Sequence, residues 1–296
     1  MRDIRRRIRT VRNIQQITKA LKMVAAARLQ RAENRAKAAR PYAEGMLAVM
    51  RHLSGARVSS RAWADGDVGA PGVAHPLLEV REPVNIGVLA ISSDRGMAGS
   101  YNFNVMRKVA EITRSHERER IKLVTVGRKA RAFFAKQQYN IASHFPMPSS
   151  EVRFADAREI SRTIRELFES REVDVFYIVY TRFYSAIRQR AMEMQLLPIA
   201  PPEGEAQGQR TEEYIFEPKP EVLLGRLLPR YVDTEIYGAM LESLASEHGA
   251  RMTAMTSATD NAAEMIDDLT LDFNRARQAS ITKELAEIVG GAEALK

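Results

Sequence analysis

Residues 4–29 read IRRRIRTVRNIQQITKALKMVAAARL. Apolar residues recur in this stretch every three or four positions, and residues 1–44 contain no Gly and a single Pro. The apolar stripe consists of Ile4, Ile8, Val11, Ile14, Ile17, Leu21 and Val24. This spacing predicts a long amphipathic helix with one apolar face.

The opposite end of the chain has the same features. Residues 230–289 contain no Pro and only two Gly, Gly238 and Gly249. Their apolar residues at helical spacing are Met252, Met255, Ala262, Met265, Leu269, Phe273 and Ala276. At about 1.5 Å per residue, the first helix would be about 65 Å long and the second about 90 Å, too long for either to bury its stripe inside an ordinary domain. We therefore predict that the N- and C-terminal helices pack against each other as a long antiparallel coiled coil.

The charges of the two segments are complementary. Residues 1–40 contain thirteen Lys or Arg and two acids, a local charge of +11 that exceeds the +8 of the whole chain. From residue 260 to 296 the balance reverses, with eight acids and four basic residues. Exposed ion pairs contribute only about 0–1 kcal/mol each. The complementary charges therefore determine which helices pair, and in which register, more than they stabilise the pair. The N-terminal apolar steps average about 3.3 residues, short of a regular supercoil, which predicts a loosely wound pair whose stripe drifts.

Between these segments the pattern alternates between strand and helix. Runs such as VNIGVLAI at 84–91 and VFYIVY at 175–180 are typical of buried strands. They predict a small central α/β domain with a mostly parallel, Rossmann-like sheet. The predicted strands are 84–91, 122–126, 175–180, 189–197 and 213–217, and the predicted helices are 103–116, 128–136 and 156–168.

Segments rich in Gly, Pro and polar residues at 54–83 and 200–210 divide the chain. The predicted domains are an N-terminal coiled-coil helix (1–56), a linker (57–83), a central α/β domain (84–217) and a C-terminal coiled-coil helix (218–296).

Composition limits the class of protein. The chain has 296 residues, of which 45% are hydrophobic and 28% charged, as in a folded, soluble protein. It has no Cys, which excludes disulfides, thiolate metal sites and a Cys nucleophile. No apolar run in the sequence reaches the roughly 18 residues of a membrane span. The Arg-rich N-terminus superficially resembles a transit peptide, but its apolar register continues past Ala27, and we interpret it as mature structure.

One loop stands where an α/β sheet places ligands. Residues 93–102 read SDRGMAGSYN and follow the first central strand. The two Gly do not form a GxGxxG motif, and no Gly-rich loop ending in Lys-Ser or Lys-Thr occurs in the sequence, so the chain lacks a P-loop of its own. A tight strand-to-helix turn that needs Gly is the favoured interpretation.

Other candidate groups do not point to catalysis. The five His residues are scattered, without the i, i+4 pairing of a helical metal site. Carboxylate pairs such as Asp267 with Asp268 are typical of a solvated helix surface. We predict no catalytic residue, no cofactor and no metal, and a mechanical role for the paired helices.

Two other functions stay open. One is a nucleotide-binding α/β enzyme with a coiled-coil oligomerisation arm, which would need a phosphate-binding loop. The other is a basic coiled coil that binds nucleic acid or an anionic membrane surface through residues 1–40. That segment lacks interleaved aromatic residues, since Tyr42 is the first aromatic residue of the chain.

Five segments carry a resemblance to a known family. They are ITKALKMVAAARL (17–29), RPYAE (40–44), SDRGMAGSYN (93–102), LASEHGARMTAMTSATDNAAEMI (244–266) and NRARQASITKELAEIVGGAEAL (274–295). Together they closely resemble the gamma subunits of F-type ATP synthases, and the resemblance covers the chain from end to end. It implies a coiled coil of the terminal helices, a small α/β domain without a nucleotide site, and a chain that is not itself an enzyme.

The role implied by the resemblance is that of a central-stalk rotor. It would couple proton-driven rotation of a c-ring to conformational change in the beta subunits, which carry the catalytic sites. The implied partners are the alpha3-beta3 hexamer, the epsilon subunit and the c-ring, with one copy of this chain per complex and no nucleic acid. The implied location is the cytoplasmic face of the bacterial plasma membrane, which the chain would reach only through the c-ring.

Individual residues match positions with known roles in this family. The implied beta-subunit contacts are Arg277, Gln278, Thr282, Lys19, Leu21 and Lys22. The implied contacts of the foot with the c-ring and epsilon side are Tyr214, Phe216 and Glu217. The residues of the strand-to-helix turn are Asp94, Arg95, Gly96 and Gly99. They match the family pattern DRGLCG, with Ala98 where a Cys often stands, which excludes thiol-based regulation at this loop.

Overall fold

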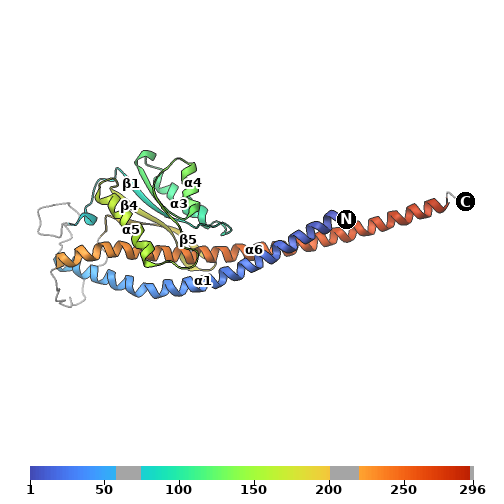
Figure 1. The fold of residues 1–296 in the computed structure, drawn as a ribbon, viewed down its shortest axis with the longest axis horizontal. Helices are drawn as coiled ribbons and strands as arrows, with labels where there is room; N and C mark the ends of the chain where they lie inside the picture. The colour runs from blue at the N-terminus through green and yellow to red at the C-terminus, as the bar shows by residue number, and fades with distance from the viewer. Residues whose placement is uncertain (58–74, 201–219, 294–296) are drawn as a thin grey trace. The chain divides into compact units, whose positions relative to one another are not determined.

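The computed structural model describes residues 1–57, 75–200 and 220–293 (Figure 1). The chain divides into two compact units. The first, here called the terminal unit, consists of Met1–Ala26 and Arg251–Lys296, and the second, the central unit, of Ala27–Ala250. Helices α1 (Arg2–Arg57) and α6 (Pro220–Glu293) contribute residues to both units.

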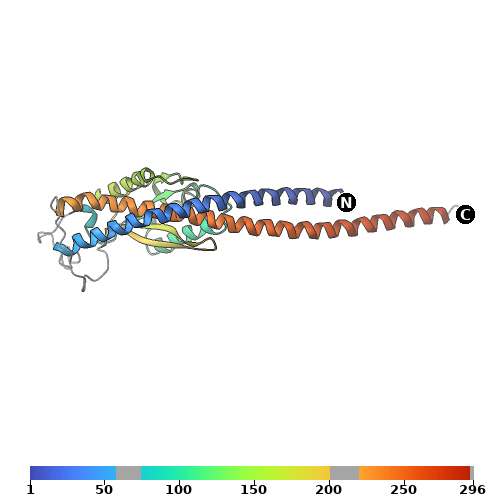
Figure 2. The same ribbon diagram turned by 90° about the horizontal axis from the view of Figure 1, so that it is seen from below.

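In the terminal unit, α1 and α6 lie side by side and run antiparallel (Figures 1 and 2). The hydroxyl of Thr259 donates a hydrogen bond to the hydroxyl of Thr18 at 2.8 Å, and the guanidinium of Arg5 lies 5.4 Å from the centre of the Phe273 ring. Residue numbers therefore fall in α1 as they rise in α6. The predicted antiparallel pairing of the two ends of the chain is confirmed.

The residues that form the seam of this pair differ from the predicted stripe. Ile14, Ile17 and Val24 are exposed, and so is Met265 of α6. The inward positions of α1 are Ile4, Ile8, Val11, Gln15, Thr18, Lys22 and Ala25. Those of α6 are Met255, Thr259, Ala262, Ile266, Leu269, Phe273 and Ala276.

The inward positions follow alternating steps of three and four residues, the average of about 3.5 that a left-handed coiled coil requires. The predicted drift of the stripe is therefore wrong. Each helix keeps a constant face toward its partner, and it does so by accepting Gln15 and Thr18 in the seam in place of Ile14 and Ile17.

The central unit contains a five-stranded sheet in the order β3–β2–β1–β4–β5. The strands are β1 (Ile86–Ile91), β2 (Ile121–Val126), β3 (Asn140–Phe145), β4 (Val175–Ser185) and β5 (Arg188–Leu197). β1 pairs in parallel with β2 and β4, and β2 pairs in parallel with β3, whereas β5 runs antiparallel to β4. All six residues of β1 are buried, as the continuous apolar run of a central parallel strand requires. The predicted α/β fold with a mostly parallel sheet is confirmed.

Helices cover both faces of this sheet (Figure 1). One face carries α3 (Tyr101–Thr113) and α4 (Arg128–Lys136), whose Val105 and Phe134 are buried with Val88 of β1 in one hydrophobic cluster. The other face carries α5 (Phe154–Glu169) and the central part of α6. The hydroxyl of Ser246 on α6 donates to the carbonyl of Thr181 on β4 at 3.0 Å, which fixes α6 to the sheet. Two short 3-10 helices, η1 (Pro76–Leu78) and η2 (Arg118–Arg120), complete the described elements.

The burial of α6 changes along its length. Between Val232 and Gly249 most residues are buried, because the sheet, α5 and α1 surround this part of the helix. In the terminal unit, in contrast, only one face of α6 is turned inward. Across the described ranges, no helix has a stretch long and apolar enough to cross a membrane.

Sequence analysis missed β3. Its residues read NIASHF and are exposed or half-buried, because β3 lies at the edge of the sheet. An edge strand of this kind has no continuous apolar run to mark it. The strand predicted at 213–217 lies outside the described residues, and the domain boundaries proposed from the sequence stay a prediction.

Candidate functional site

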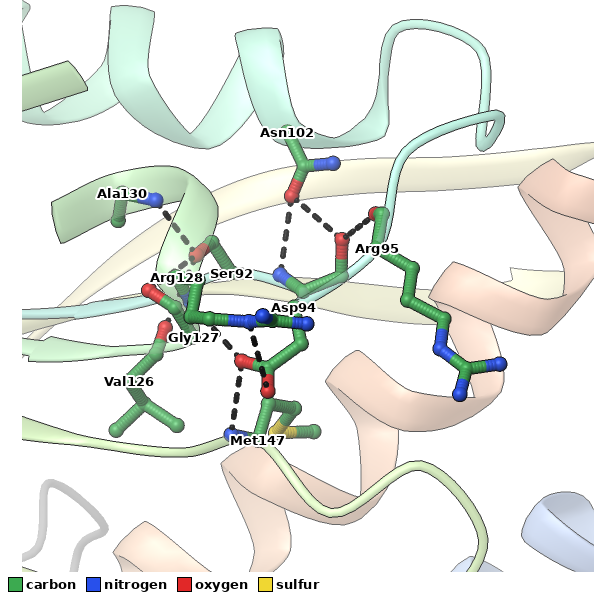
Figure 3. Close-up of polar contacts among 10 residues, drawn as sticks. Ser92, Asp94, Arg95, Asn102, Val126, Gly127, Arg128, Ala130 and Met147 are labelled. Carbon is green, nitrogen blue, oxygen red and sulfur yellow. Dashed lines mark hydrogen bonds and ion pairs between the residues drawn. The ribbon is translucent and has the colours of Figure 1, made fainter. Parts of the chain in front are cut away.

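The turn that follows β1 lies at the carboxyl end of the parallel sheet, where α/β proteins commonly bind ligands. Figure 3 shows the polar contacts of its residues. The carboxylate of Asp94 accepts hydrogen bonds from the backbone N–H groups of Arg128, at 2.9 Å, and Met147, at 3.3 Å. Its other oxygen lies 3.5 Å from the guanidinium of Arg128. Asp94 therefore ties the turn to the start of α4 and to the segment that follows β3.

Ser92 and Ser93 also form hydrogen bonds to neighbouring elements of the domain. The hydroxyl of Ser92 donates to the carbonyl of Val126 and accepts from the N–H of Ala130, both at 3.0 Å. The backbone N–H of Ser93 donates to the side-chain oxygen of Asn102 at 3.0 Å. These contacts link the ends of β1 and β2 to the starts of α3 and α4.

The backbone is close-packed at this point. Gly127, which precedes α4, has φ +90°, and a Cβ atom there would lie 2.4 Å from the carbonyl oxygen of Ser92. Gly99 also has a positive φ, +52°. The side chain of Arg95 is exposed and points away from these contacts (Figure 3). Since the carboxylate, the hydroxyls and the amide oxygen bind groups of the chain itself, the geometry favours a structural turn over a ligand-binding loop.

The residues implied as beta-subunit contacts fall into two groups in the terminal unit. Arg277, Gln278 and Thr282 are exposed on α6. Lys19 is exposed on α1, next to the position where Thr18 meets Thr259. Residues 259 and 277 of α6 are about 27 Å apart along the helix, so the structure does not bring the two groups together.

Leu21 and Lys22 belong to the second group but are half-buried. Lys22 occupies an inward position of the coiled coil, so its aliphatic stem packs along the seam while its ammonium group can reach solvent. Of the other implied contacts, Tyr214, Phe216 and Glu217 lie outside the described residues.

Sequence analysis did not single out the apolar residues in the last turns of α6. The helix continues past the N-terminus of α1 (Figures 1 and 2), and the residues that follow Ser280 up to Val289 are all exposed. Four of them are large and apolar, with exposures of 50–68%: Ile281, Leu285, Ile288 and Val289. Their helical spacing could have revealed this stripe.

The chain was compared with known proteins. A family model described as ATP synthase matches residues 1–295. The ATP synthase gamma chain of Heliobacterium modesticaldum is 48% identical over 301 residues, which cover 100% of this chain and 99% of that relative.

Among solved structures, a chain of the Euglena gracilis mitochondrial ATP synthase (OSCP/F1/c-ring) matches with a TM-score of 0.68 and 18% identity, over 99% of this chain and 94% of that one. A chain of the central stalk and c-ring structure of the Tetrahymena thermophila mitochondrial ATP synthase matches with a TM-score of 0.59 and 22% identity, over 82% and 99% of the two chains. These two likenesses support the fold.

Proposed function

Since this chain belongs to the ATP synthase gamma chain family, we propose that it is the rotor of the central stalk of an F-type ATP synthase. Proton-driven rotation of a c-ring turns the chain, and its turning drives conformational change at the catalytic sites of the beta subunits. The chain itself is a stalk subunit and not a catalytic one.

The observation that carries this proposal is the exposed apolar end of α6. No described part of the chain covers Ile281, Leu285, Ile288 or Val289. Apolar surface left in water costs about 25 cal/mol per Å² relative to burial, so this end of the helix gains stability if a surrounding assembly encloses it. A ring of alpha and beta subunits is an enclosure of this kind.

The asymmetry of the chain accounts for its effect on such a ring. A single helix pair inside a three-fold ring presents a different surface to each beta subunit. We propose that Arg277, Gln278 and Thr282 bind a loop of one beta subunit, while Lys19, Leu21 and Lys22 face an acidic loop of the same kind of subunit. As the chain turns, each beta subunit meets these residues in succession and passes through different conformations.

The remaining partners are the epsilon subunit and the c-ring. We propose that Tyr214, Phe216 and Glu217 bind on that side, that one copy of the chain is present per complex, and that the turn of Asp94, Arg95, Gly96 and Gly99 keeps the α/β domain rigid. The chain is then a peripheral protein at the cytoplasmic face of a bacterial plasma membrane, which it reaches through the c-ring.

Co-purification tests the assignment. An affinity-tagged chain is co-expressed with the alpha and beta subunits of the same organism, and the complex is analysed by native mass spectrometry. We expect three alpha and three beta subunits per chain. A control chain that ends at residue 276 lacks the exposed apolar end of α6 and should assemble less completely.

Two results would contradict the proposal. Recovery of the chain without alpha and beta subunits would exclude the rotor role. Micromolar affinity of the pure chain for ATP in calorimetry would favour the nucleotide-binding enzyme instead.

A further inference from the structure

The central unit contains a cavity of about 420 Å³ between α1, α6 and the α/β domain. It exists because the facing positions of the two helices carry small residues, Ala36, Ala39 and Ala43 on α1 and Gly238 and Ala239 on α6. A Cβ atom at Gly238 would meet no other atom within 4 Å. Cavities that bind small molecules measure roughly 300–1,000 Å³, so this one is large enough for a compact organic ligand.

Aromatic side chains form much of the remaining wall. Phe154 of α5, Tyr180 of β4 and Tyr237 of α6 line the cavity together with Tyr42 of α1. The rings of Phe154 and Tyr237 meet edge to face with their centres 5.5 Å apart, so they are held in place by each other. The faces of such rings attract cations as well as apolar groups.

Two carboxylates also line the cavity, Glu235 and Glu242 of α6. They are seven residues apart and thus lie on the same face of the helix. Glu235 is hydrogen-bonded to the hydroxyl of Tyr231, and Glu242 to the backbone of Phe183. The Oε2 atom of Glu242 is buried and has no hydrogen-bond partner among the described residues. Each buried carboxylate oxygen without a donor is unfavourable, so this atom lacks the donor that would stabilise its charge.

The pKa values of the residues that line the cavity also indicate that the carboxylates lack sufficient stabilisation of their charge. Burial raises the pKa of Glu235, and the neighbouring charge of Glu242 raises it further. Burial also raises the pKa of Glu242, against the opposing effects of Arg182 on β4 and Arg40 on α1. Burial and the charge of Glu242 raise the pKa of Tyr180 to about 12. Among the described residues that line the cavity, Arg40 is the one basic residue, and it is exposed.

We propose that this cavity binds a small organic cation, a molecule with an apolar body and an ammonium group. The ammonium group donates hydrogen bonds to Glu242 and Glu235, and the apolar body packs against the aromatic rings and the small residues of α1. A neutral ligand of the same shape brings no positive charge to balance the buried carboxylates, and an anionic one is repelled.

Calorimetry of the full chain with three isosteric probes tests the proposal. The probes are 4-phenylbutylamine, 4-phenylbutanol and 4-phenylbutyrate at neutral pH. We expect saturable binding of the amine at one site, at least about fivefold weaker binding of the alcohol, and the weakest binding of the acid. Binding of the amine should weaken as the pH falls and Glu235 and Glu242 become protonated, whereas binding of the alcohol should not change.

Variants locate the site. Glu242→Gln and Glu235→Gln should each weaken amine binding about fivefold or more and leave alcohol binding unchanged. Glu117→Gln, on the exposed surface at η2, is the matched control and should have no effect. Gly238→Leu fills the cavity from α6 and should abolish binding of both the amine and the alcohol. Ala39→Leu fills it from α1 and replaces Gly238→Leu if that variant does not fold, as judged by circular dichroism.

Several results would overturn the proposal. Equal affinity for the amine and the acid would show that the carboxylates do not select the ligand. Unchanged amine binding in both filled variants would place the site elsewhere. No detectable binding of the amine at millimolar concentration would exclude a cation site in this cavity.

Discussion

Glu235 lies on α6 with its carboxyl group near Tyr231 and Glu242, and burial raises its pKa. The folded chain therefore holds this proton to a higher pH than the unfolded chain does. The carboxyl group contributes stability at low pH, and that contribution is lost as the pH rises through the pKa of the folded state. Above that pKa, the ionised side chain destabilises the folded chain relative to the protonated one.

The change Glu235→Gln tests this effect. Gln keeps the size and the acceptor oxygen of the side chain but has no charge, so the variant should melt at a higher temperature than the parent at about pH 8. The difference should shrink toward about pH 4, where the parent carboxyl is protonated. Thermal unfolding at several pH values measures it, with the exposed Glu117→Gln as control. A melting temperature that shifts equally at all pH values would contradict the assignment.

Gly127 is the residue on which the turn after β1 depends most. Its φ of +90° is strained for any other residue, and a Cβ atom there would lie 2.4 Å from Ser92. We expect Gly127→Ala to destabilise the chain by about 2 kcal/mol or more, because backbone strain and the clash add. Gly45→Ala is the matched control, since Gly45 is helical and has open space around it, and it should stabilise the chain by roughly 0.5–1 kcal/mol. Chemical denaturation compares the two, and a neutral Gly127→Ala would mean that the turn can rearrange.

At the scale of the helices, the coiled coil of the terminal unit depends on its heptad positions. Met255 is an inward residue with 6% exposure, whereas Met265, ten residues further along α6, is 51% exposed. We expect Met255→Ala to destabilise the helix pair by about 2–3 kcal/mol and Met265→Ala by less than about 0.5 kcal/mol. Urea unfolding of the full chain followed by helical circular dichroism measures both. Equal effects would show that the seam is not the one described.

The same helices show what could be predicted from sequence. Two long amphipathic segments predicted the pairing, because neither could bury its whole apolar stripe inside a domain of ordinary size. The choice of inward residues failed, since hydrophobicity alone selects Ile14 and Ile17, whereas supercoiling requires seven-residue repeats and brings Gln15 and Thr18 inward. The hydroxyl of Thr18 is satisfied there by Thr259, a contact that no single-helix pattern can reveal.

In the α/β domain, too, features with a local sequence pattern could be predicted, whereas features that depend on tertiary packing could not. β1 and β4 were recognised because burial on both faces demands apolar runs, and β3 was missed because it is an edge strand. The turn at Ser93–Asn102 was recognised from its Gly residues and its place after β1, but the role of Asp94 in joining α4 to the segment after β3 was not. The cavity beside Gly238 was also missed, because a cavity is a property of packing between helices distant in sequence.

At the scale of the whole molecule, the proposed rotor role concentrates function on residues that contribute little to folding. Arg277 and Gln278 are exposed on α6. Their replacement should change the free energy of unfolding of the chain by no more than about 0.5 kcal/mol. Replacing them should reduce ATPase turnover only in the complex, where each side chain would bind a beta-subunit loop.

The variant Arg277→Leu in the reconstituted alpha–beta–gamma complex distinguishes an effect on the stability of the chain from an effect on the activity of the complex. A hydrogen bond to a charged group contributes roughly 1.5–3 kcal/mol, so losing it should reduce steady-state ATPase turnover by about tenfold or more if it stabilises one rotary state over the others. Lys22→Ala should have a smaller effect, because the ammonium group of Lys22 reaches solvent and is screened by salt. Assembly should be normal in both variants, since neither change removes an apolar residue of the seam or the exposed end of α6. Parental turnover of the Arg277→Leu complex at full subunit stoichiometry would remove Arg277 from the coupling mechanism, while the coiled coil and the family assignment would stand.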